Sequence, residues 1–118
     1  MPIIRNPILP GFNPDPSICR VDEDFYIATS TFEWFPGVQI HHSRDLVNWH
    51  LLTHALGEKR LLDLQGVPSS GGIWAPALSW HDGLFYLCYT VVHQHEAATK
   101  DTPNFLITSA SIHGPWSV

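Results

Sequence analysis

The chain has 118 residues, of which 44% are hydrophobic and 14% charged, and its formal net charge is −5. This length and hydrophobic content suit one domain with a real core, and the six scattered basic residues argue against nucleic-acid or anionic-membrane partners. No stretch is long and apolar enough for a transmembrane helix, and the proline-rich beginning lacks the continuous apolar segment of a secretory signal.

The first distinctive motif in the chain is Asn13-Pro14-Asp15-Pro16. Each proline fixes its own φ and disfavours helical geometry in the preceding residue, so we expect Asn13 and Asp15 to be extended. One interpretation is a rigid turn that leads into the first strand. The other is a carboxylate held in place for chemistry. The motif alone leaves both open.

Short runs of aromatic and aliphatic residues predict strands along the whole chain, whereas helical periodicity is nearly absent. Two hairpins are expected, one pairing residues 17–20 with 24–30 and the other pairing 77–80 with 84–90. Acidic turns separate the runs, and Asp82-Gly83 is a strong hairpin signal. The sequence therefore predicts an all-β fold.

The two hairpins also form a repeat, because one constant offset relates Pro16, Phe25 and Tyr26 to Pro76, Phe85 and Tyr86. In each unit a further strand follows, at 38–43 and 105–109, and contains a serine. A tryptophan, Trp49 or Trp116, then comes near a last short strand. Four antiparallel strands form one blade of a β-propeller, so we expect blade-like repeats at about 16–65 and 76–118.

Two blades are too few for a closed propeller, since propellers typically have four to eight. We therefore expect an incomplete fold, about two blades of a larger propeller whose other parts lie outside this sequence. A self-contained small β-sandwich is the alternative.

Aromatic residues are abundant, with five tryptophans, three tyrosines and six phenylalanines. Flat aromatic faces suit sugar rings, but they equally suit an apolar core. Trp49, Trp80 and Trp116 occupy repeat-related or strand-interior positions, so we expect them to pack within and between blades.

The histidines and cysteines predict neither a metal site nor a disulfide. Neighbouring His41 and His42 would face opposite sides of a strand, and His93 and His95 have no third ligand at a defined spacing. No metal or other cofactor is expected. The two cysteines lie in apolar, strand-like runs without a CxxC spacing, which favours a reduced, cytoplasmic protein.

Four motifs in order resemble the amino-terminal part of bacterial β-xylosidases of glycoside hydrolase family 43. They span residues 6–17, 26–38, 42–49 and 71–76. The resemblance implies a five-bladed propeller with an axial active site, followed by a β-sandwich domain. It also implies an inverting exo-β-1,4-xylosidase that releases xylose from the non-reducing ends of xylo-oligosaccharides.

For individual residues, the resemblance implies that Asp15 is the general base and that Phe32 and Trp74 form walls of the sugar subsite. An inverting glycosidase needs a second carboxyl group about 6.5–9.5 Å away, on the other face of the sugar. The family's acid is a glutamate well downstream, and its motif is not among these residues. Glu33 is the one other acidic residue beside an active-site motif. We therefore expect residues 1–118 alone to be inactive.

Two other functions remain open from the sequence. The family shares its base motif with α-L-arabinofuranosidases, so substrate choice is not fixed. A noncatalytic sugar-binding or interaction module that kept the aromatic face is the alternative from another class. The full-length form as a homo-oligomer also stays open.

Overall fold

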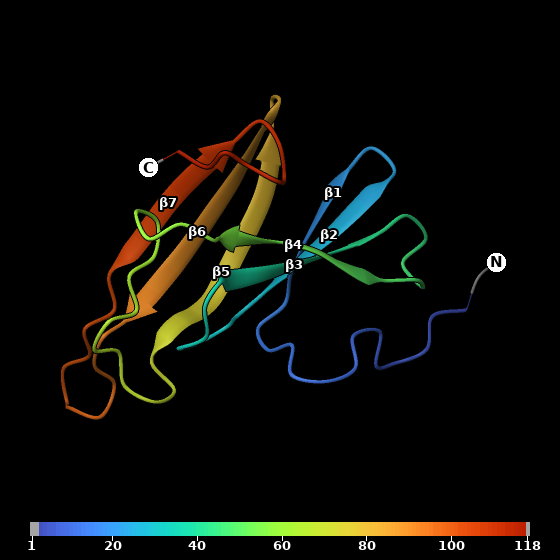
Figure 1. The fold of residues 1–118 in the computed structure, drawn as a ribbon. Coiled ribbons are helices and arrows are strands. Elements are labelled where there is room, and N and C mark those ends of the chain that lie inside the picture. The colour runs from blue at the N-terminus through green and yellow to red at the C-terminus, as the bar shows by residue number, and fades with distance from the viewer. Residues whose placement is uncertain (1–2, 118) are drawn as a thin grey trace.

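A computed structural model describes residues 3–117, and its strands form two antiparallel sheets (Figure 1). The first sheet has the order β1 (Ser17–Val21), β2 (Asp24–Thr29), β3 (Gly37–Ser43), β4 (His50–Leu56). The second has the order β5 (Gly72–His81), β6 (Leu84–Val92), β7 (Asn104–Ser109). The all-β prediction is confirmed, although β5 begins at Gly72 rather than at Ala77.

Equivalent strands pair in the same register in the two sheets. Phe25 of β2 pairs with Ser43 of β3, and its counterpart Phe85 of β6 pairs with Ser109 of β7. Each serine then accepts a backbone hydrogen bond from the turn that follows it, Ser43 from Asp45 and Ser109 from Ser111. The repeat seen in the sequence is therefore a repeat of strand pairing.

The hydrophobic core lies between the sheets. Ile40 and Leu56 of the first sheet and Ile73 and Leu87 of the second are fully buried in one cluster. Because apolar burial is the main favourable term in folding, this shared cluster stabilises the pairing of the two sheets.

One hydrogen bond and one contact between aromatic rings fix how the sheets pack against each other. The amide of Leu78 on β5 donates to the Ser17 hydroxyl on β1 at 3.0 Å. The rings of Tyr26 and Phe85 meet edge to face, with centroids 5.5 Å apart.

The tryptophans predicted to pack take up different positions. Trp116 is buried in the core cluster, and Trp80 is half-buried against it. Trp49 is half-buried, and its indole N–H donates to the Leu46 carbonyl at 3.1 Å. The packing role is confirmed for Trp80 and Trp116, whereas Trp49 braces the turn before β4.

The segment that connects the two sheets, residues 57–71, is fixed at several points. The buried Tyr89 hydroxyl donates to the Leu61 carbonyl at 2.7 Å, and Arg60 donates to the Trp116 carbonyl at 2.8 Å. Arg60 also pairs with Glu58 at 2.7 Å. This insertion therefore closes one side of the core.

The two cysteines differ in burial. Cys19 is buried on β1 and Cys88 is exposed on β6, and both are free thiols. Burial raises the pKa of the Cys19 thiol. Among the described residues no helix is long and apolar enough to cross a membrane.

Candidate active site

Asp15 lies on an irregularity of the first sheet, just before β1. The Ser30 amide donates to the Pro14 carbonyl at 3.0 Å, and Ser17 pairs with Ala28, so Asp15 and Pro16 together face only Thr29. Two residues opposite one is the arrangement of a β-bulge, which bends a strand and re-aims its side chains.

The backbone of Asp15 differs from the prediction. Its φ is 53°, in the left-handed region, so the expectation of extended geometry was wrong for this residue. Aspartate adopts this region more readily than most residues. The bulge and the hydrogen bond from Ser30 to Pro14 thus override the local preference that the following proline imposes.

The carboxylate of Asp15 has one partner among residues 3–117. The Ser30 hydroxyl donates to its Oδ2 at 2.6 Å, the length of a charge-assisted bond. Ser30 is 2% exposed, whereas Asp15 is exposed. A buried hydroxyl therefore holds one oxygen of a carboxylate that stays open to water.

A pocket with aromatic walls adjoins Ser30, the partner of Asp15. A pocket of about 550 Å³ is lined by Phe12, Ser30, Thr31, Trp34 and Gln39. Phe12 and Trp34 are about two-thirds exposed, and the Phe12 ring lies 5.8 Å from the Phe32 ring. The partner of Asp15 is thus part of the wall of an aromatic pocket.

Phe32, in the loop after β2, and Trp74, on β5, are linked through the backbone. Phe32 and Ile73 exchange two hydrogen bonds of 2.9 Å, and Trp74 directly follows Ile73. The Trp74 indole donates to the Ser70 carbonyl at 2.8 Å, and its ring lies 5.9 Å from that of His95. Trp74 is therefore held in a fixed, half-buried position.

Gly72 makes this close approach of the two chains possible. A Cβ at Gly72 would lie 2.2 Å from the Phe32 carbonyl oxygen, and the residue has a φ of +77°. Both facts exclude a side chain, because L-residues rarely adopt this conformation and no room exists for one. Gly72 therefore allows the backbones at Phe32 and Ile73 to approach each other.

The three predicted site residues lie at one end of the two sheets, where β2 and β6 end and β1 and β5 begin (Figure 1). Glu33 is at the same end, where its carboxylate accepts from the Ser70 amide at 3.2 Å. Glu33 thus ties the loop that carries Phe32 to the segment that leads into β5.

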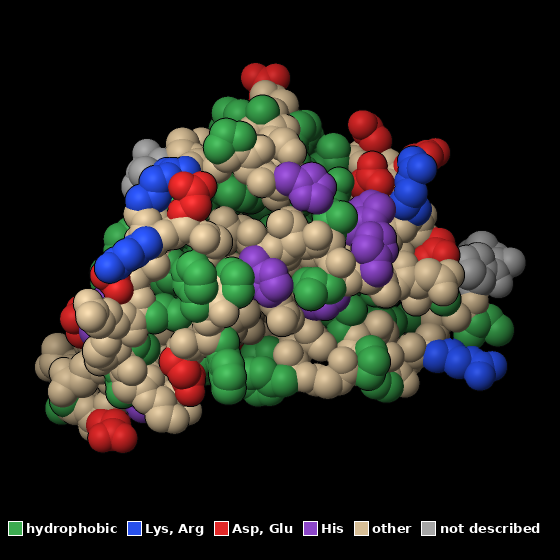
Figure 2. Space-filling model, viewed as in Figure 1, with side chains coloured by type: hydrophobic (Ala, Val, Ile, Leu, Met, Phe, Trp, Pro, Cys, Tyr) green, Lys and Arg blue, Asp and Glu red, His purple; other side chains and the backbone are tan. Residues whose placement is uncertain are grey.

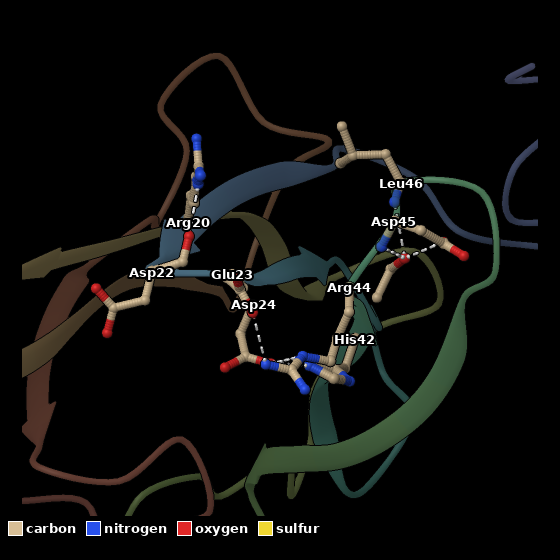
Figure 3. A network of polar contacts seen from close by, with 9 residues as sticks. Arg20, Asp22, Glu23, Asp24, His42, Arg44, Asp45 and Leu46 are labelled. Atoms are coloured by element: carbon tan, nitrogen blue, oxygen red, sulfur yellow. Dashed lines mark hydrogen bonds and ion pairs between the residues drawn. The ribbon is translucent and has the colours of Figure 1, made fainter. Parts of the chain in front are cut away.

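A separate polar network occupies the hairpin end of the first sheet (Figure 3). Asp24 contacts His42 at 2.7 Å and Arg44 at 3.4 Å, and Arg44 also reaches Glu23 at 3.2 Å. Asp24 is the first residue of β2, in agreement with the strand expected at 24–30. These carboxylates are engaged at the end opposite Asp15.

Asp45, in the turn after β3, has a structural role as well. Backbone and side-chain N–H groups of Asn48, together with the Val47 amide, hold the pKa of the Asp45 carboxyl well below its usual range. The residue therefore stays ionised as an acceptor within its own turn.

Four of the eight histidines lie on β3 and β4, and Figure 2 shows histidine side chains over this sheet. His41 is buried, and this burial, together with the neighbouring His54 and His50, lowers its pKa. His42 is half-buried, and its ring meets that of its cross-strand partner His50 edge to face, with centroids 5.1 Å apart. Within residues 3–117 no three histidine, cysteine or acidic side chains converge as metal ligands.

Sequence reasoning did not single out Phe12, Ser30, Trp34 or Gln39. A signal for Ser30 was present, because the repeat offset places Ser30 opposite Thr90 and Asp15 opposite Ala75. A hydroxyl is common to both units at this position, but an acid occurs in only one.

Comparison with known proteins extends these observations. Xylosidase/arabinosidase 43B of Humicola insolens is 64% identical over 118 residues, which cover 99% of this chain and 22% of that protein. The β-xylosidase of Bacillus subtilis (strain 168) is 62% identical over 97% of this chain and 21% of its own length. This chain thus spans about a fifth of the length of these relatives.

The structural comparison agrees. The crystal structure of xylan β-1,4-xylosidase from Bacillus halodurans C-125 matches with a TM-score of 0.95 and 62% identity, over 98% of this chain and 22% of that one. Its fold identifies the sheets β1–β4 and β5–β7 as two blades of a β-propeller, here called the first and second blade. The family model described as glycosyl hydrolases family 43 matches residues 4–118. The chain belongs to glycosyl hydrolase family 43.

Proposed function

We propose that this chain is part of an inverting exo-β-1,4-xylosidase that releases xylose from xylo-oligosaccharides, with Asp15 as its general base. The observation that carries the proposal is the exposed Asp15 carboxylate, fixed by Ser30 beside an aromatic pocket. The names of the Bacillus relatives, a β-xylosidase and a xylan β-1,4-xylosidase, support the substrate class.

The reaction divides between two carboxyl groups. The Asp15 carboxylate takes a proton from water while that water attacks the anomeric carbon, and a carboxylic acid protonates the departing oxygen. Phe32 and Trp74 hold the sugar ring through apolar contact with its C–H faces. Their placement at the Asp15 end of the blades is consistent with these roles.

The general acid comes from outside the residues described here. At the Asp15 end, Glu33 is engaged with the Ser70 amide, and the carboxylates of Figure 3 lie at the other end. We therefore expect residues 1–118 alone to be inactive, because leaving-group protonation and the remaining walls of the pocket are both absent from them.

The test uses a chimaera in which residues 1–118 replace the matching part of the Bacillus subtilis β-xylosidase. We expect it to hydrolyse a nitrophenyl β-xyloside and xylobiose, with inversion detectable by NMR of the first-formed sugar. Asp15→Asn should lower kcat by about 100- to 10,000-fold. Asp82→Asn, in a hairpin turn, is the matched control and should leave kcat unchanged.

Two results would contradict the proposal. One is a folded chimaera without glycosidase activity, and the other is an Asp15→Asn variant that keeps most of its rate.

An α-L-arabinofuranosidase is the second candidate, since the Humicola insolens relative is named a xylosidase/arabinosidase. Faster hydrolysis of a nitrophenyl α-L-arabinofuranoside than of the xyloside would favour it.

A further inference from the structure

Ser30 is the residue in this structure that acts directly on Asp15. We propose that Ser30 is a positioning residue for the base: its hydroxyl fixes Oδ2 of Asp15, so that Oδ1 is the oxygen that receives the proton from water. This inference rests on the proposed function and adds a residue and an atom to it.

The geometry assigns different environments to the two carboxylate oxygens. Oδ2 accepts from the Ser30 hydroxyl at 2.6 Å, while Oδ1 has no hydrogen-bond donor among residues 3–117. A carboxylate on an exposed strand start is free to rotate about its side-chain bonds, and one strong hydrogen bond removes much of that freedom. The oxygen left without a donor is the one available to water.

Ser30 is itself well anchored. Its side chain is buried, and its amide donates to the Pro14 carbonyl at 3.0 Å. One residue at the end of β2 therefore holds both the backbone just before Asp15 and the carboxylate of Asp15. A catalytic group held by a rigid, buried partner keeps the geometry that the reaction needs.

The second blade has the same backbone arrangement at the position equivalent to Asp15, but no acidic residue there. The counterparts of Pro14 and Ser30 are Trp74 and Thr90, which are register partners, and the same register shift follows between Trp74 and Ala77. Ala75 replaces the acid there, and the Thr90 hydroxyl bonds instead to the Asn104 side chain. The bulge and the hydroxyl are thus common to both blades, and the carboxylate on the hydroxyl is particular to the first.

The proton balance of the step is simple. The water oxygen bonds to the anomeric carbon, the bond from that carbon to the leaving oxygen breaks, and one water proton passes to Oδ1 of Asp15. The acid's proton passes to the leaving oxygen. Ser30 keeps its own proton throughout, so its contribution is orientation rather than proton transfer.

The experiment compares Ser30→Ala with Ser30→Thr and Ser43→Ala in the chimaera. Ser43 is a matched control, because it is a buried serine of the same blade whose hydroxyl bonds to Asp45 at the opposite end. We expect Ser30→Ala to lower kcat by about 10- to 100-fold through misplacement of the base, with KM unchanged. Ser30→Thr keeps the hydroxyl and should restore most of the rate, whereas Ser43→Ala should affect stability alone.

The leaving group gives a second readout that a merely structural role would not produce. Because the base acts on water, the loss in Ser30→Ala should be the same for a nitrophenyl β-xyloside as for xylobiose. A larger loss with xylobiose would indicate a disturbed acid and overturn the proposal, as would an unchanged kcat. If Asp15→Asn still abolishes activity in that case, the proposed function stands and only the role of Ser30 fails.

Discussion

The first and second blades pair their strands in the same register but differ at the end where β1 and β5 begin. The first blade carries Asp15 on Ser30, and the second carries Ala75 opposite Thr90. The backbone irregularity exists in both. The candidate base therefore lies on a backbone irregularity that both blades share, and its position requires no local fold that is particular to the first blade.

The contact between the blades is the most sensitive part of this arrangement. Replacing Gly72 by alanine would place a Cβ against the Phe32 carbonyl at a left-handed φ. We expect Gly72→Ala to lower the free energy of unfolding of the chimaera by at least about 2 kcal/mol, since strain and overpacking add. Denaturant unfolding followed by tryptophan fluorescence measures this loss.

Gly57→Ala is the control for that change. Gly57 has open space around the Cβ position and no positive φ, so alanine should be tolerated there. Equal stability of the two variants would show that the Phe32 and Ile73 bridge does not join the blades as closely as described.

Most of the strands could be predicted from the sequence because the two blades repeat the same pattern. The hairpins, the third strands and the packing of Trp80 and Trp116 follow from short-range alternation and turn signals, which act within one unit. Asp15, Phe32 and Trp74 were identified through resemblance to a family, and their common location at one end follows from the strand order.

Other features could not be read from the sequence, because they depend on contacts between distant residues. The left-handed backbone of Asp15 arises from Ser30, which is remote in the chain. Glu33 is engaged by the Ser70 amide of the other loop, and Asp24 contacts His42 and Arg44, which are also remote in the chain. Local propensity has no access to such tertiary partners.

Trp74 and Trp80 lie on the same strand, β5, and separate a binding role from a packing role. Trp74 lies at the Asp15 end, and Trp80 packs against the core near Phe85, with ring centroids 4.6 Å apart. We expect Trp74→Ala to lower kcat/KM by about 10-fold, mainly through KM, because one aromatic contact with the sugar is lost.

Trp80→Ala should show the opposite behaviour, with reduced stability and an unchanged KM. Steady-state kinetics and thermal unfolding of the two variants give the comparison. A Trp74→Ala variant with a normal KM and reduced stability would assign Trp74 to packing in the apolar core rather than to sugar binding.

The smallest expected effect concerns a core position that differs between the blades. His41 of β3 and Ile107 of β7 are counterparts, since they pair with Ile27 and Leu87 respectively. His41 is buried with its Nδ1 unpaired among the described residues, and its pKa is lowered by burial and by His54 and His50. Folding therefore favours the neutral ring.

This shift makes stability depend on pH. The unfolded chain binds the proton more readily, so the contribution of His41 is fully present above its unfolded pKa of about 6.5 and is lost as the pH falls below it. His41→Ile introduces the residue of the second blade and should flatten the decline in unfolding temperature between neutral and mildly acidic pH. His54, whose pKa is also lowered by burial, should maintain part of the decline. An identical decline in His41→Ile would mean that the ring is not held neutral by its surroundings, and the difference between the two cores would then carry no pH dependence.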